Sequence, residues 1–266
     1  SLITSDWDKK SSPKRFSFLL WEWEKVKTVK KSIIEPLWIK DFADLVDRFD
    51  VEVVRKEFFA LYMDLFLELY WEIKDNDTFK VLIEQWKIEP ISFAKNLMWK
   101  MIFLYFIQKK WWLWITDPNA KFGNGDRDFF KNNFDNLAHK GNLFRTSTNF
   151  YNDFLEPLFY SWLNKKNEFD WNKQLSMKVP YLNGWLFQEE YDWENTVINL
   201  NNDIFKSIID CFDTYNFTID EDDPIDREIA VDPEMLWKIF ESMISVNDEN
   251  IDKILDSYIK SKKKTK

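Results

Sequence analysis

Two side chains of types that often carry catalysis or bind metals occur once each in this sequence, His139 and Cys211. A Ser-His-Asp or Cys-His nucleophilic site would have to use His139 as its base. His139 stands just before Gly141, in a stretch that predicts the end of a helix, where the helix dipole favours a cation. We therefore predict a C-terminal capping role for His139. One histidine and one cysteine cannot fill a four-ligand zinc site, so we predict no metal ligands.

A run of acidic side chains near residue 220 is a second place where chemistry could arise. Clustered carboxylates can hold a divalent cation, which could support hydrolysis. The run lacks the alternating spacing and the following glycine of a calcium-binding loop. We favour a solvated acidic connector and keep a metal-dependent hydrolase as the less favoured alternative. The residues are Asp220, Glu221, Asp222, Asp223 and Asp226.

The stretch Gly123-Asn-Gly-Asp126 is the third candidate, because glycine-rich loops can cradle phosphates. It is not followed by Lys-Ser or Lys-Thr, and it does not lie between a strand and a helix. We interpret it as a turn. The sequence also contains no Asn-Pro-Pro-aromatic motif. The residues alone therefore predict no catalytic and no cofactor-binding side chain.

The charge balance argues against a chain that clamps nucleic acid with its whole surface. The net charge is −9, whereas phosphate binding needs clustered cations. The dense basic cluster lies at the C-terminus, and its like charges are also typical of a solvated, frayed end. The candidate DNA-phosphate contacts are Lys260, Lys262, Lys263 and Lys264.

The apolar content predicts a large core in a soluble protein. Hydrophobic residues make up 45% of the chain and aromatic residues 18%. The longest apolar run, Met101–Ile107, is far shorter than a membrane span, so no membrane association is expected. A single cysteine excludes a disulfide framework, and no secretory signal segment is present. These features predict a reducing, cytoplasmic setting.

Hydrophobic spacing predicts a mainly α fold, a multi-helix bundle-like domain. Residues 91–110 are apolar nearly all round, which indicates a central helix that follows Pro90. A small β-hairpin insertion is predicted around 166–200, because Asn183-Gly184 is a hairpin signal. The predicted helices cover residues 33–50, 51–74, 91–110, 127–138, 149–164, 201–213 and 248–262, and another helix begins at Pro233 with an apolar stripe that extends to Ile244.

Three parts are expected along the chain. Residues 1–15 are polar and predict a loose N-terminal segment. Residues 16–246 form the helical domain, with the β insertion at about 166–200. Residues 247–266 hold a C-terminal helix and the basic tail.

Six segments, in order and spacing, resemble the helical region that precedes the methyltransferase core in large adenine-specific DNA methylases. Type IIG restriction–modification enzymes and related phage-defence methylases belong to that group. The resemblance covers roughly residues 14–250, and six segments in the right order make it fairly specific. The segments are 103–114, Phe122–Phe130, Asn149–Tyr160, Val179–Phe187, Tyr215–Asp222 and Ala230–Glu241.

The resemblance implies a bacterial protein that uses S-adenosylmethionine and binds DNA. In the family, a Phe-Tyr-Thr-Pro motif comes next and opens the methyl-donor domain, and an Asn-Pro-Pro-Tyr loop follows it. This chain contains neither, so the resemblance implies a fragment that is not catalytically competent alone. Its expected role is that of a connector that positions the catalytic and recognition parts. Whether a nuclease accompanies it stays open, and a stand-alone helical protein-interaction module is the main alternative.

The chain departs from the family pattern at its tryptophans. It has 15 tryptophans and 4 glycines, where roughly 19 glycines would be usual. Trp112 matches a family tryptophan, but other tryptophans stand where relatives usually have glycine. Our hypothesis is that UGA codons are read as glycine in the source organism and were translated as tryptophan. UGG codons at these positions would end that hypothesis. The positions are Trp21, Trp23, Trp38, Trp99, Trp111, Trp114, Trp185 and Trp237.

Overall fold

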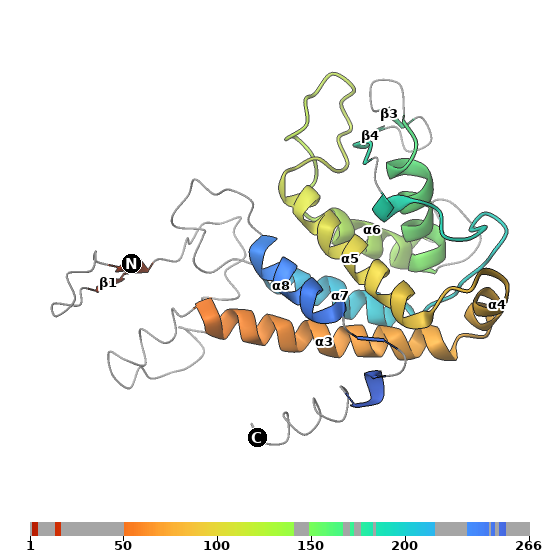
Figure 1. Cartoon of the computed structure of the whole chain (residues 1–266). Coiled ribbons are helices and arrows are strands. Elements are labelled where there is room, and N and C mark those ends of the chain that lie inside the picture. The colour runs from red at the N-terminus through yellow and green to blue at the C-terminus, as the bar shows by residue number, and fades with distance from the viewer. Residues whose placement is uncertain are drawn as a thin grey trace.

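The computed structural model confirms the mainly α fold (Figure 1). It describes residues 2–4, 14–16, 51–140, 149–166, 171–172, 177–182, 185–215, 233–244, 246–247 and 250–253. The helices of this part are α3 (Val51–Asp75), α4 (Asp77–Trp86), α5 (Pro90–Lys109), α6 (Phe129–Lys140), α7 (Asn202–Thr214) and α8 (Pro233–Ile244). Two π-helical segments, η2 (Tyr151–Leu155) and η3 (Pro157–Leu163), and a 3-10 turn, η5 (Trp185–Phe187), complete them.

Strands are short and pair only in twos within the described residues. β1 (Leu2–Thr4) runs antiparallel to β2 (Lys14–Phe16). β3 (Trp171–Asn172) runs antiparallel to β4 (Met177–Lys178), inside the stretch where a β insertion is predicted. Asn183-Gly184 lies outside the described residues, and residues 185–187 after it form η5 and not the expected strand.

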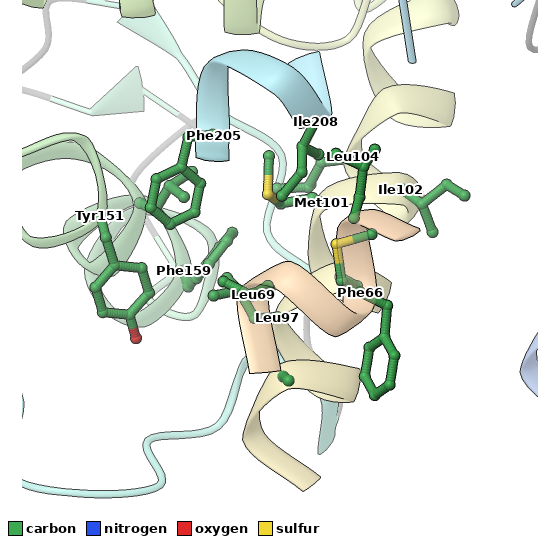
Figure 2. Close-up of a cluster of buried hydrophobic side chains, with 14 of the residues drawn as sticks. Phe66, Leu69, Leu97, Met101, Ile102, Leu104, Tyr151, Phe159, Phe205 and Ile208 are labelled. Atoms are coloured by element: carbon green, nitrogen blue, oxygen red, sulfur yellow. The ribbon is translucent and has the colours of Figure 1, made fainter. Parts of the chain in front are cut away.

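Helix α5 lies at the centre of the core, as its all-round apolar sequence predicts. α5 packs against α3, and α3 also packs against α7. Figure 2 shows side chains of these helices meeting in one cluster, with η2 and η3 beside them. Pro90 begins α5 without losing a hydrogen bond, since the first helical N–H groups have no partner within the helix. The labelled core residues include Phe66, Leu69, Leu97, Met101, Phe159, Phe205 and Ile208.

The predicted helix at 149–164 is present, but it is wound as a π-helix. Pro157 has no N–H to donate to the carbonyl four residues back, so the α-helical ladder cannot continue through it. The Glu156 N–H donates instead to the Tyr151 carbonyl, five residues back. Asn149 begins the segment as a cap: its Oδ1 accepts from the Asn152 N–H (3.0 Å), and Asp153 accepts from the Asn149 N–H (2.9 Å).

Helix α4 was not predicted, because residues 77–86 are short and largely exposed. Asn76 caps it by accepting from the Phe79 N–H, and the Asn76 amide also donates to the Asn199 carbonyl (2.9 Å). The cap thus joins α4 to a segment far along the chain. The predicted helix at 33–50 lies outside the described residues, as does most of the one at 248–262.

The end of α5 places a tryptophan where proteins usually have glycine. The Trp112 N–H donates to the Ile107 carbonyl (3.3 Å), and the Trp111 N–H donates to the Gln108 carbonyl (2.9 Å). These two bonds define a Schellman motif, whose first residue after the cap adopts a left-handed conformation. That residue is Trp111, with φ 59°, and Trp114 follows with φ 65°. A residue with a Cβ is strained in the left-handed conformation, whereas glycine is not.

Two glycines, Gly123 and Gly125, pack closely against the same turn. The Trp111 carbonyl accepts from the N–H groups of Gly123 (3.1 Å) and Gly125 (2.7 Å). A Cβ on Gly125 would lie 2.1 Å from the Leu113 carbonyl oxygen, so no other residue fits there. Gly123 has φ 107°. The predicted turn at 123–126 is therefore confirmed, and its role is to fold back onto the end of α5.

The eight tryptophans of the recoding hypothesis do not share one environment. Trp111 and Trp114 have left-handed backbones, whereas Trp99, Trp185 and Trp237 lie in α5, η5 and α8. Among the described residues, the other non-glycine residue with positive φ is Lys87, the C-cap of α4. The backbone therefore favours glycine at 111 and 114 by itself. Trp21, Trp23 and Trp38 lie outside the described residues.

Replacing Trp111 with glycine is expected to give a more stable protein than replacing it with alanine, by about 1 kcal/mol. Both changes remove the indole, so the comparison isolates the Cβ at a left-handed residue. The order should reverse at Trp99, inside α5, where alanine is favoured over glycine by about 1 kcal/mol. Urea unfolding of the four variants measures both differences. Alanine ahead of glycine at residue 111 would contradict the left-handed assignment.

Candidate functional site

The sequence-predicted residues do not form a site within the described part of the chain. Lys260, Lys262, Lys263 and Lys264 lie outside it, and so does the acidic run 220–226. The DNA contacts and the metal-dependent hydrolase therefore stay predictions. His139 is the last residue but one of α6, the helix end where a capping role is predicted. No group of three or more potential metal ligands occurs among the described residues.

Cys211 is placed on α7, half-buried against the core. Burial raises the pKa of its thiol to about 12. The thiol is therefore protonated near neutral pH, whereas cysteine nucleophiles react as thiolates. Cys211 is a packing residue in this structure.

A buried ion pair is the first polar feature that the sequence did not reveal. Lys100 lies in the middle of α5, and its Nζ donates to Glu190 (2.8 Å) and to the Tyr160 hydroxyl (3.2 Å). The Lys100 side chain is 3% exposed and that of Glu190 25%. Burial lowers the pKa of Lys100, and the charge of Glu190 opposes this shift. The Lys100 ammonium also lies 4.8 Å from the centre of the Tyr160 ring, a cation–π contact.

Three tyrosines extend the pair into the core. Tyr191 donates its hydroxyl proton to Glu156, so the 2.8 Å bond between Tyr151 and Tyr191 must use the proton of Tyr151. Burial is the main cause that raises the pKa of Tyr151, Tyr160 and Tyr191, and neighbouring carboxylates add to it. The three phenols therefore stay protonated well beyond their ordinary range.

This Lys100–tyrosine cluster is enclosed, which limits what it can do. We define it as Lys100, Glu190, Tyr160, Tyr151, Tyr191 and Glu156. Tyr151 and Tyr160 are 1% exposed and Glu156 is fully buried, so a substrate could not touch them in this conformation. Buried polar groups must be paired, and the pairing fixes η2, η3 and α5 in one arrangement. Lys100 is the one charged residue within the apolar stretch 97–107 of α5, and this was the signal that could have found the cluster.

A cavity between α5 and α8 is lined by apolar and aromatic side chains. Its volume is about 340 Å³. Trp99 contributes from α5 and Trp237 from α8, and both rings lie against Phe240, at 4.7 and 6.0 Å between ring centres. Two of the eight tryptophans of the recoding hypothesis thus line the same cavity, and the shape of the cavity depends on their indole rings.

The loop after α5 lies at one end of the helical body (Figure 1). Its sequence is rich in cations and aromatic residues. We define the basic–aromatic loop as residues 109–131 together with Lys178 of β4. An isolated bridge between Ile115 and Lys178 ties the two segments together. Lys110 lies over the ring of Trp112 (5.6 Å), Lys178 over that of Phe122 (5.7 Å), and the two rings lie 5.7 Å apart. The guanidinium of Arg127 lies 5.2 Å from the ring centre of Trp111.

None of the described helices is long and apolar enough to span a membrane. The charged residues in this part of the chain lie mostly on its surface.

Comparison with known proteins gives one significant similarity. The chain is 26% identical over 242 residues to the curated protein named "Putative type II restriction enzyme and methyltransferase" of Methanocaldococcus jannaschii. The match takes in 86% of this chain and 18% of that protein's length. No family model matches the sequence, and no solved structure is significantly similar. The chain is thus distantly related to a restriction enzyme and methyltransferase.

Proposed function

We propose that this chain is a helical connector of a DNA adenine methyltransferase or restriction–modification enzyme, and that it positions the catalytic and DNA-recognition parts. The observation that carries the proposal is the similarity to the M. jannaschii protein, which takes in most of this chain but less than a fifth of that protein. The proposed parent uses S-adenosylmethionine, acts on DNA and works in the cytoplasm.

The architecture suits such a role. A connector must hold two parts at a fixed separation, which requires elements that do not bend independently. α5 is buried along its length, and the Lys100–tyrosine cluster ties it to η3 and to Glu190. Asn76 and Asn149 join further distant segments through the carbonyls of Asn199 and Leu200. These contacts would keep the helical domain rigid, so that the parts attached to it stay in a fixed relative position.

The test uses the protein encoded by the complete reading frame and its flanking sequence. We expect that protein to transfer a labelled methyl group from S-adenosylmethionine to adenine in DNA. Replacing residues 51–244 with a flexible Gly/Ser linker should preserve methyl-donor binding and abolish methylation of DNA, because the parts lose their fixed geometry. A matched control carries only an exposed change on α7, Asp210→Asn, and should keep full activity.

Two results would contradict the proposal. One is a linker variant that methylates DNA as fast as the unmodified protein. The other is a complete frame that encodes no methyl-donor domain, which would instead favour the interaction module.

A further inference from the structure

We propose that the basic–aromatic loop is a DNA-contacting surface that binds the phosphate backbone of duplex DNA. The choice of DNA as partner rests on the proposed function. The surface itself is argued from charge and geometry, and it is separate from the C-terminal lysines.

The loop carries a local charge opposite to that of the chain. Within residues 109–131 and Lys178, six cations stand against three carboxylates, although the whole chain has a net charge of −9. A phosphate backbone is attracted to such a local excess of cations. The cations are Lys109, Lys110, Lys121, Arg127, Lys131 and Lys178.

Two of the three carboxylates of the loop accept hydrogen bonds from neighbouring residues of the same segment. Asp117 accepts from the Asn119 N–H (2.9 Å). Asp126 accepts from the Asp128 N–H (2.8 Å) and from the Asn132 side chain (2.7 Å). Three of the loop lysines, Lys110, Lys121 and Lys131, are exposed. Phosphates of a DNA backbone could therefore reach them.

The aromatic rings hold cations in place. Lys110 lies over the ring of Trp112 and Lys178 over that of Phe122, and the two rings contact each other at a tilted angle. Lys178 also donates to the Ala120 carbonyl (2.8 Å), which fixes its position further. Cations ordered before binding lose less side-chain entropy when they meet phosphates. Because an ammonium group lies over each of these two rings, this part of the loop presents positive charge, which favours contact with the phosphate backbone over base recognition.

The test is a binding titration of the full 266-residue chain against a short duplex of mixed sequence at several salt concentrations. The loop variant Lys110→Gln/Lys121→Gln/Lys131→Gln changes three exposed lysines. The matched control, Lys80→Gln/Lys87→Gln/Lys206→Gln, changes three exposed lysines on α4 and α7. A third variant neutralises Lys260, Lys262, Lys263 and Lys264. Circular dichroism confirms that each variant keeps its helices.

The loop variant should bind duplex DNA more weakly and with a shallower dependence on salt. If its three lysines each contact a phosphate, the slope of log affinity against log salt should fall by about 2.7, since each contact contributes about 0.9. A slope of about 2.7 corresponds to an affinity that falls by a factor of about 40 between about 50 and 200 mM salt. The control should keep the slope of the unmodified chain, and the tail variant should keep the share of about 2.7 that the loop contributes.

Four outcomes overturn the inference. Three come from the duplex titration: no binding by the unmodified chain, equal losses in the loop and control variants, or a loss confined to the tail variant. The fourth is tighter binding to single-stranded RNA in a parallel titration. The proposed function fails separately, because it is measured by methyl transfer in the complete protein. Loop-dependent DNA binding without methyl transfer would refute the function and keep the surface.

Discussion

The Glu190→Gln variant is expected to unfold about 3 kcal/mol more easily than the unmodified protein. Glu190 compensates the Lys100 ammonium, which lies in the core on α5 with a side chain 3% exposed. Glutamine keeps the shape and a hydrogen-bond acceptor but removes the charge. Without its counter-charge, the buried ammonium has a desolvation cost that no interaction offsets. This cost is larger than the free energy of the lost hydrogen bond.

Urea unfolding at neutral pH measures the loss, and the Lys206–Asp210 pair on α7 supplies the control. Both of those side chains are more than half exposed, so Asp210→Asn should leave the unfolding free energy unchanged within error. The double variant Lys100→Met/Glu190→Gln should regain much of the loss, because it removes the unpaired charge. Equal effects of Glu190→Gln and Asp210→Asn would contradict the buried-pair interpretation.

The pH dependence of the Glu190→Gln variant has a definite sign. Burial already lowers the pKa of Lys100 from its ordinary value of 10.5, and Glu190 opposes that shift. Without Glu190, the folded protein releases the Lys100 proton at a lower pH than the unfolded chain does. The unfolded state then binds more protons between those two pKa values, so the variant's disadvantage should shrink as pH rises toward 10.5.

The helices were predictable because their apolar spacing is repeated over many residues. α3, α5, α7 and α8 begin and end within a few residues of the predicted limits. α4 was missed because ten residues with two buried side chains carry little periodic signal. Its position depends on the bond from Asn76 to Asn199, a contact across the chain that no local pattern encodes.

The polar interior could not be predicted for a different reason. Glu156, Tyr160 and Glu190 are ordinary residues in sequence, and Glu156 is fully buried where the two π-helical segments meet before Pro157. The left-handed turn at Trp111 shows the opposite case. Composition pointed to a conflict between tryptophan and glycine, and the backbone at residues 111 and 114 supplies a physical reason for it. Composition alone could not tell these two positions from Trp99 and Trp237, which lie in helices.

Raising the pH above about 10 is expected to destabilise the protein steeply, because its buried tyrosines resist ionisation. Burial is the largest cause that raises the pKa of four of them well above 10.0: Tyr105, Tyr151, Tyr160 and Tyr191. In the unfolded chain these phenols ionise near their ordinary pKa. The folded state therefore binds more protons above that pH, and the stability that is fully present below pH 10 is lost as pH rises toward the folded pKa values. Each such tyrosine contributes a slope of about 1.4 kcal/mol per pH unit.

Tyr105→Phe tests the origin of that slope with a minimal change. The Tyr105 hydroxyl is at 3.4 Å from the Ile209 carbonyl, a long bond whose loss costs little beside the loss of an ionisable group. Urea midpoints measured between about pH 9 and pH 11 should fall less steeply in Tyr105→Phe, by the share of one tyrosine. The phenolate absorbance of Tyr105, measured as the difference between the unmodified protein and Tyr105→Phe, should appear only together with unfolding. If this difference appears while both proteins are still folded, or if the slope is unchanged in the variant, Tyr105 ionises without leaving the core.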